Sequence, residues 1–262
     1  LATLRDEPEV LASFFAETDA KSDVDLIEDL WRHVRPETID VLDAAGIRAV
    51  GTARSAAEAA SSAWFDVAGI RIAHFGYTYW FNGFLLPEDQ PWAANQIDEA
   101  RILDDAAAAR NEGADFVMVS MHWGDEYRHQ PSEQQADLGP RLLASDDIDL
   151  IIGHHAHVVQ PIERIDGEWL IYGLGNLIAN HEQAPRRDEL LVVATVVEQD
   201  DGTFAADHLE VIPLYVDDAT LTIWPSGRRA RTPDTPEALA FELDASWARV
   251  TEVLRDGSGW RE

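Results

Sequence analysis

The stretch Phe116-Val-Met-Val-Ser-Met-His122 decides the fold of this sequence. Its residues before the histidine are almost continuously apolar, which is typical of a strand buried on both faces in a parallel sheet. A second strand of this kind is expected at Ile148–Ile152, and helices are expected at Asp98–Asn111 and Ser132–Ala144. Strands that alternate with helices in this way favour an α/β fold.

Further elements extend the pattern in both directions. We expect paired strands at Ala63–Ala68 and Ile70–Tyr77, joined by a turn at Gly69. The remaining predicted strands are Ile47–Val50, Trp169–Tyr172, Leu190–Glu198 and His208–Pro213, and the remaining helices in this region and the tail are Glu37–Ala45 and Glu237–Arg255. These elements predict three parts: an acidic helical segment (1–35), a main domain (36–222) and a C-terminal loop with an amphipathic helix (223–262).

Charge and composition exclude several function classes. The 262 residues include 49 acidic and 20 basic side chains, which give a formal net charge of −29. A surface this negative repels phosphate backbones, so we expect no nucleic-acid partner. No run of apolar residues approaches the length of a membrane span, so we expect no membrane segment in this chain. The absence of cysteine leaves histidine, carboxylates and amides as ligands for any metal.

Histidines follow two successive predicted strands. His122 follows the first strand directly, and His154, His155 and His157 follow the second. Ligands collect at the carboxyl ends of strands in open α/β sheets, so these side chains are expected to share one crevice. Neutral imidazoles suit zinc, manganese and iron, and the carboxylates that follow His122 in sequence could complete the shell: Asp125 and Glu126. The alternative is that some of these histidines are surface residues or hydrogen-bonded core residues.

A third strand end carries Tyr172-Gly-Leu-Gly-Asn176. Its two glycines allow the backbone to approach a bound group closely, and Asn176 supplies an amide for a ligand or for a bond within the loop. A tight glycine-rich turn capped by asparagine explains the same residues without a ligand. Local chemistry leaves both interpretations open.

Three ordered motifs resemble the CapA/PgsA capsule-synthesis family. They are His122-Trp-Gly-Asp-Glu-Tyr127, Gly153-His-His-Ala-His-Val-Val-Gln160 and Tyr172-Gly-Leu-Gly-Asn176. The resemblance extends from about Pro36 to about Pro213. The family is associated with poly-γ-glutamate biosynthesis and has the calcineurin-like metallophosphatase fold. The resemblance therefore implies an α/β metallophosphatase-like sheet sandwich flanked by helices, with capsule or polyglutamate synthesis machinery as its partner.

The resemblance also implies roles for individual residues. His122, His155 and His157 match the family's metal ligands, for a divalent ion such as manganese, zinc or iron. Glu126 and His154 are the candidate catalytic residues, and His154 could protonate a leaving group. Asn176 is the candidate cofactor-binding residue. The alanine between the last two histidines departs from the family's usual proline.

The front of the chain departs further from the family pattern. The family's first three motifs supply an Asp, an Asn-Leu-Glu and an Asn-His, and none of them is present in this sequence. We therefore expect the domain to lack its N-terminal strands, and the three histidines can supply one divalent ion with three ligands. Localisation stays open: the resemblance implies a bacterial or archaeal protein that is either cytoplasmic or held at the cell envelope through the missing region.

Three functions remain open at this point. The first is a metal-dependent phosphoesterase-type enzyme of capsule or poly-γ-glutamate synthesis. The second is a non-catalytic scaffold or polymer-handling subunit with a vestigial metal site. The third is a metal-dependent hydrolase of γ-glutamyl amide bonds, because both phosphoester and amide cleavage need a polarised oxygen and an activated water.

Overall fold

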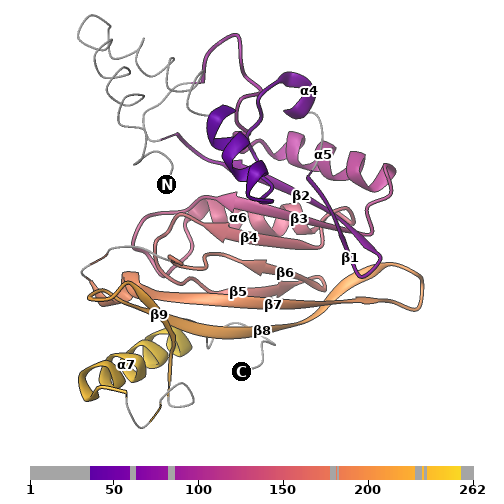
Figure 1. The fold of residues 1–262 in the computed structure, drawn as a ribbon. Helices are drawn as coiled ribbons and strands as arrows, with labels where there is room; N and C mark the ends of the chain where they lie inside the picture. The colour runs from indigo at the N-terminus through magenta and orange to yellow at the C-terminus, as the bar shows by residue number, and fades with distance from the viewer. Residues whose placement is uncertain are drawn as a thin grey trace, which may run out of the picture. The chain divides into compact units, whose positions relative to one another are not determined.

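A computed structural model describes residues 36–59, 63–81, 86–177, 181, 183–227, 232 and 235–254 (Figure 1). Residues 36–44 are helical, and the elements that follow are α4 (Ala56–Ala59), β1 (Ala63–Val67), β2 (Ile70–Thr78), α5 (Glu99–Asn111), β3 (Phe116–His122), α6 (Glu133–Leu143), β4 (Leu150–His154), β5 (Ile162–Ile165), β6 (Glu168–Ile171), η2 (Ala184–Arg187), β7 (Asp188–Glu198), β8 (Phe204–Asp217), β9 (Thr222–Pro225) and α7 (Glu237–Leu254). The described residues form two compact units, one from segments 36–59 and 80–95 and one from segments 63–79 and 96–254.

The larger unit is built around a six-stranded sheet in the order β1-β2-β3-β4-β6-β5. Strands β2, β3, β4 and β6 are parallel, and the two edge strands pair antiparallel with their neighbours. A second sheet has the order β7-β8-β9 and is antiparallel throughout. Figure 1 shows the two sheets stacked within this unit.

Alternate residues of the central strands enter two different cores. Val117 on β3 belongs to a core that α5 and α6 cover, together with Ile102 and Leu142 from those helices. Phe116, one residue earlier, belongs to the core between the two sheets. Helix α7 packs against β8 and β7. Apolar residues on both faces explain why the strand reads as a continuous apolar run, and the expected α/β arrangement of sheets flanked by helices is confirmed.

Two helices of the larger unit, α5 and α6, begin at side-chain caps. The Asp98 carboxylate accepts a hydrogen bond from the Arg101 backbone N–H (2.9 Å) at the start of α5. At α6, Ser132 and Gln135 form a capping box, in which each side chain bonds the other residue's backbone. Caps of this kind stabilise a helix by about 1 kcal/mol. The predicted helices at 98–111 and 132–144 are therefore confirmed to within a cap residue.

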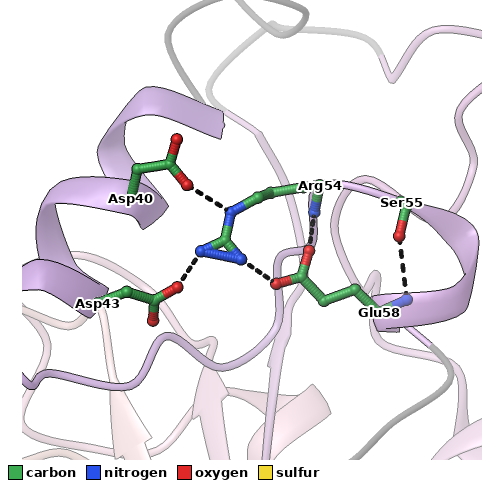
Figure 2. A network of polar contacts seen from close by, with 5 residues as sticks. All are labelled: Asp40, Asp43, Arg54, Ser55 and Glu58. Atoms are coloured by element: carbon green, nitrogen blue, oxygen red, sulfur yellow. Dashed lines mark hydrogen bonds and ion pairs between the residues drawn. The ribbon is translucent and has the colours of Figure 1, made fainter.

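The smaller unit contains a cluster of ion pairs around Arg54 (Figure 2). The Arg54 guanidinium donates to Asp40 (2.8 Å) and also pairs with Asp43 and Glu58. Ser55 accepts a bond from the Glu58 backbone N–H (3.2 Å), which fixes the start of α4. In this acidic chain, three carboxylates surround one arginine.

Some predicted elements differ from the structure. Residues 47–50 form no strand, because the only pairing near them is an isolated bridge between Thr52 and Ala94 among the described residues. The short strands β5 and β9 were not predicted. No described helix combines the length and the apolar character needed to cross a membrane. The predicted boundaries at 35/36 and 222/223 stay predictions, and the 1–35 segment lies outside the described residues.

Candidate metal centre

The histidines gather at the carboxyl edge of the six-stranded sheet, as the strand-end argument predicts. In the sheet register, His122 at the end of β3 lies opposite Thr78 at the end of β2 and opposite His154 at the end of β4. His155 and His157 follow in the loop after β4. The parallel register therefore brings the ends of three strands level, and the site is formed where the chain leaves them.

Two of these histidines and a nearby carboxylate form a group that can hold a metal ion. One ligand atom from each of Glu126, His155 and His157 lies within 4.8 Å of the other two. Two imidazoles and one carboxylate are a donor set that suits zinc and other divalent transition metals, with a coordination position left for water or substrate. Glu126 is exposed, whereas only 8% of His155 is exposed, so the group opens to solvent on the carboxylate side.

Hydroxyl groups hold two of the imidazoles in place. The Tyr79 hydroxyl lies 2.9 Å from Nε2 of His155, so Nδ1 is the nitrogen of His155 left for a ligand in this arrangement. The Thr78 hydroxyl lies 3.0 Å from Nδ1 of His122, which leaves Nε2. The rings of His122 and His155 are 4.5 Å apart between centroids, and Tyr79 packs beside both. His122 is outside the three-residue group but adjoins it.

Asn176 orients His157. Its amide nitrogen donates to the backbone carbonyls of His157 (3.1 Å) and Arg186 (3.0 Å), which directs the amide oxygen away from those carbonyls. That oxygen lies 2.7 Å from Nδ1 of His157. An amide oxygen only accepts, so Nδ1 carries the proton and Nε2 keeps its lone pair. A second hydrogen bond that fixes the tautomer is typical of histidine ligands to metals.

The backbone of the site adopts a conformation that is unfavourable for residues with a side chain. His155 has φ +94°, His157 has φ +55° and Tyr127 has φ +64°. A left-handed residue other than glycine costs about 1–2 kcal/mol. The Tyr127 N–H donates to the Ala156 carbonyl (2.7 Å), which ties the two left-handed loops together. Strain of this kind concentrates at functional sites.

Close packing behind the loop makes Gly153 necessary. A Cβ atom at this position would overlap the Tyr172 carbonyl, and it would meet Nε1 of Trp123 at 2.7 Å. The same carbonyl accepts a hydrogen bond from the Trp123 indole (3.2 Å). Trp123 is fully buried, so it packs in the core behind the loop.

Burial keeps the imidazoles neutral near neutral pH. Burial, and then the neighbouring histidines, lower the pKa of His122 to about 4. Burial is also the main cause that lowers the pKa values of His154 and His155. A neutral imidazole is the form that binds a metal, so the site does not need to lose protons when an ion binds at these rings.

The structure brings most of the predicted site residues together. His155, His157 and Glu126 form the group, His122 adjoins it, and Asn176 contacts His157. Asn176 acts on the site through His157 and the loop backbone, so the bond within the loop is the interpretation that the geometry favours. Whether any of these residues binds an ion stays a prediction.

His154 takes a different position from its neighbours in sequence. It is the last residue of β4, and its charge influences His74, whose pKa is lowered to about 4 by burial and by His154. His74 in turn lies 2.9 Å from the Ser120 hydroxyl. Asp125, a candidate ligand from the sequence, is not part of the three-residue group. The role of His154 as a proton donor stays a prediction, and its lowered pKa favours the neutral ring, which accepts a proton.

Several residues near the group were not singled out as site residues from the sequence. Tyr79 follows β2 directly, so the rule that found the histidines could have found it. Arg186 stacks on the Tyr127 ring (3.5 Å from guanidinium carbon to centroid), and His181 lies 5.7 Å from His157 between ring centroids. These residues come from loops and from η2, where periodicity carries no signal.

Comparisons with known proteins agree with the motifs. The family model described as "Bacterial capsule synthesis protein PGA_cap" matches residues 35–181. The PGA biosynthesis protein CapA of Bacillus subtilis (strain 168) is 33% identical over 155 residues, which are 59% of this chain and 39% of that protein. The capsule biosynthesis protein CapA of Bacillus anthracis is 27% identical over 227 residues, 86% of this chain and 51% of that protein. The chain thus spans about half, or less, of these relatives.

Solved structures show a partial likeness in fold. Sulfate thiohydrolase SoxB of Thermus thermophilus is similar over 74% of this chain and 29% of its own, with 20% identity and a TM-score of 0.42. The calcineurin-like phosphoesterase YfkN of Bacillus subtilis is similar over 74% and 57%, with 13% identity and a TM-score of 0.35. Both likenesses cover about three quarters of this chain, and both TM-scores lie below 0.5.

Proposed function

The chain belongs to the bacterial capsule synthesis protein family PGA_cap, and from this premise we propose that it is a metal-dependent phosphoesterase-type protein of capsule or poly-γ-glutamate synthesis. The observation that carries the chemistry is the group of Glu126, His155 and His157, whose ligand atoms lie within 4.8 Å of one another. Synthesis machinery for the polymer is the proposed partner. Manganese, zinc and iron are the candidate ions.

The chain's own residues prepare the site in three ways. Asn176 and Tyr79 hold His157 and His155 so that one ring nitrogen of each stays available. Burial lowers the pKa of His155, which favours its neutral ring with a lone pair for a metal. The exposed Glu126 carboxylate completes the group from the solvent side and can accept a proton there. A divalent ion, when bound, supplies a Lewis acid that polarises a phosphoryl or acyl oxygen and lowers the pKa of water.

His122 and His154 extend the proposal. His122 adjoins His155 and presents Nε2, so it is proposed as a further ligand. His154 is proposed to move a proton, with its neutral ring as the starting form. Both roles come from the family pattern and need separate tests.

Metal content and hydrolysis test the proposal together. The purified chain would be analysed for bound metal, titrated with Zn²⁺ and Mn²⁺, and assayed on a generic phosphomonoester and phosphodiester. We expect His155→Ala to lose metal affinity and turnover. His208→Ala is the matched control, because His208 is a partly exposed histidine on β8. A wild-type chain that binds neither ion, or a His155→Ala variant with unchanged activity, would contradict the proposal.

A non-catalytic role is the second candidate. The described residues supply one group of three ligands, whereas a two-metal phosphoesterase holds two ions about 3.5–4 Å apart. A metal ion that raises the unfolding temperature without any turnover would favour a scaffold or polymer-handling subunit. Cleavage of γ-glutamyl amide bonds uses the same ligands, and analysis of the products would separate it from phosphoester cleavage.

A further inference from the structure

Arg186 lies beside the proposed metal centre in an unusual setting for this chain. It is the third residue of η2, it is half-buried, and its guanidinium carbon lies 3.5 Å from the centroid of the Tyr127 ring. The Tyr127 ring also stacks with that of His157 (5.9 Å between centroids, 28° between planes). Tyr127 therefore contacts both a guanidinium and a predicted metal ligand.

The backbone of Arg186 is fastened to the same corner. Its carbonyl accepts a hydrogen bond from Asn176 (3.0 Å), and Asn176 also bonds the ring and the carbonyl of His157. The Arg186 N–H donates to the Gln183 carbonyl (3.0 Å). Arg186 is thus placed from two sides, by the ring under its side chain and by the amide that orients His157.

Among the described residues, no carboxylate lies within ion-pair distance of Arg186. The contrast with Arg54 is informative, because three carboxylates surround that guanidinium (Figure 2). Arg249 is also paired, with Asp188 (2.6 Å). In a chain with 49 acidic residues, the carboxylates that the structure describes thus leave the charge of this arginine, beside the proposed metal centre, without an ion-pair partner.

The geometry points to a binding site for an oxyanion at Arg186, next to the Glu126, His155 and His157 group. The Arg186 guanidinium carbon lies over the Tyr127 ring, and a guanidinium carries its N–H groups in a planar fork that matches two oxygens of a carboxylate or a phosphate. The ligand class is therefore a molecule whose anionic group binds Arg186 while the rest reaches the metal group. This inference rests on the proposed function for what the ligand meets beyond Arg186.

Charge explains why an arginine is needed at this place. The net charge is −29, and the exposed Glu126 carboxylate adds negative charge at the centre. A phosphate or carboxylate approaching the site is repelled unless cations offset this field. Arg186 supplies one fixed positive charge beside the centre, independent of any ion.

Nuclear magnetic resonance on the full chain tests the inference directly. The Nε–H signal of Arg186 would be assigned by its loss in Arg186→Lys and followed during titration with inorganic phosphate and, separately, with N-acetyl-L-glutamate. A chelator keeps the protein free of metal in one series, and Zn²⁺ is present in the other. We expect the signal to shift and saturate with at least one anion in the metal-free series. A response to phosphate alone indicates a phosphoester ligand, and a response to the glutamate derivative alone indicates a carboxylate ligand.

Variants quantify the contribution of the fork. Arg186→Gln is expected to weaken anion binding by about tenfold or more, because a hydrogen bond to a charged group is worth about 1.5–3 kcal/mol. Arg186→Lys keeps the positive charge but lacks the paired N–H groups, so its anion affinity should lie between those of the wild type and Arg186→Gln. Arg141→Gln, which removes an exposed arginine paired with Glu99 and Asp137, is the control and should bind as the wild type does.

The failure of this inference is distinguishable from failure of the proposed function. An Arg186 signal that moves with neither anion, or an Arg186→Gln variant with wild-type anion affinity, overturns the anion site whether or not metal binds. A chain that binds no metal but shows the Arg186 response overturns the metal proposal and supports the anion site. If Arg186→Gln does not fold, the wild-type signal and the lysine variant still decide the outcome.

Discussion

The two ends of the six-stranded sheet use buried polar residues in opposite ways. At the amino end, Asp149 accepts hydrogen bonds from the Arg110 guanidinium and from the Val117 backbone N–H, and Arg110 also donates to two backbone carbonyls. At the carboxyl end, neutral imidazoles keep ring nitrogens available, and the backbone is left-handed at His155 and His157. The amino end thus pairs Asp149 with Arg110, whereas the carboxyl end keeps ring nitrogens available, as the proposed metal centre requires.

Protonation distinguishes the two ends as well. Burial and Asp149 raise the pKa of Glu168, at the start of β6, to about 7. Burial lowers the pKa of His74, in the middle of β2, and of His122, at the end of β3, to about 4. Both shifts favour the neutral form, but they make the free energy of unfolding depend on pH with opposite signs.

The largest expected effect is at the amino end. Asp149→Ala removes the carboxylate and leaves the Arg110 charge and the Val117 N–H without this partner. Loss of one partner of a buried ion pair costs about 3–5 kcal/mol, so we expect the free energy of unfolding in urea to fall by that order. Asp207→Ala, at an exposed aspartate on β8, is the control and should change it by less than about 0.5 kcal/mol.

The contrast between the two ends of the sheet also requires that the loss of Asp149 leaves metal binding at the carboxyl end intact. The Asp149→Ala variant, measured under conditions where it is folded, should bind Zn²⁺ with wild-type affinity, because the site lies at the other end of the strands. A loss of stability below about 1 kcal/mol would show that Asp149 and Arg110 are no more than a surface pair.

The pH dependence gives the next largest effect. The unfolded state has an ordinary histidine pKa of about 6.5, so it binds a proton between pH 6.5 and 4 that the folded His74 does not bind. Stability from this group is therefore complete above pH 6.5 and is lost as the pH falls toward 4. Replacing His74 with leucine should reduce the stability lost between pH 7 and pH 4.5 by about 2 kcal/mol, measured by urea unfolding at each pH.

Glu168 provides the opposite sign for comparison. Its folded pKa of about 7 lies above the ordinary value of 4.5, so its contribution is complete below pH 4.5 and is lost as the pH rises through 7. Glu168→Gln should therefore reduce the loss of unfolding free energy as the pH rises from 4.5 through 7. If His74→Leu leaves the acid limb as steep as in the wild type, His74 is not a source of the acid sensitivity.

The sequence predicted the parts of the site that continue from long strands. His122 and the histidines after β4 are placed by buried runs of the chain, so strand-end reasoning located them. Arg186 and Tyr127 meet through loops that are distant in sequence, and no local pattern encodes that contact. The same limit applies to β5, whose four residues include Glu163 and Arg164 and show little apolar periodicity. Conversely, the apolar run at 47–50 forms no strand, because a run needs a partner as well as a pattern.

The smallest effect concerns the left-handed backbone. His155→Ala and His155→Gly both remove the imidazole, so they lose the same contacts, including the bond to Tyr79. They differ in that glycine adopts φ +94° freely and alanine does not. We expect the glycine variant to be more stable than the alanine variant by about 1 kcal/mol in urea unfolding. At Val193, in the body of β7, the order should reverse, because glycine in a strand costs about 0.5–1 kcal/mol relative to alanine.

An alanine variant as stable as the glycine variant at position 155 would mean that the loop relaxes once the imidazole is gone. The left-handed backbone would then be a consequence of holding His155 in the site, and the cost of the carboxyl end would lie in its side chains alone.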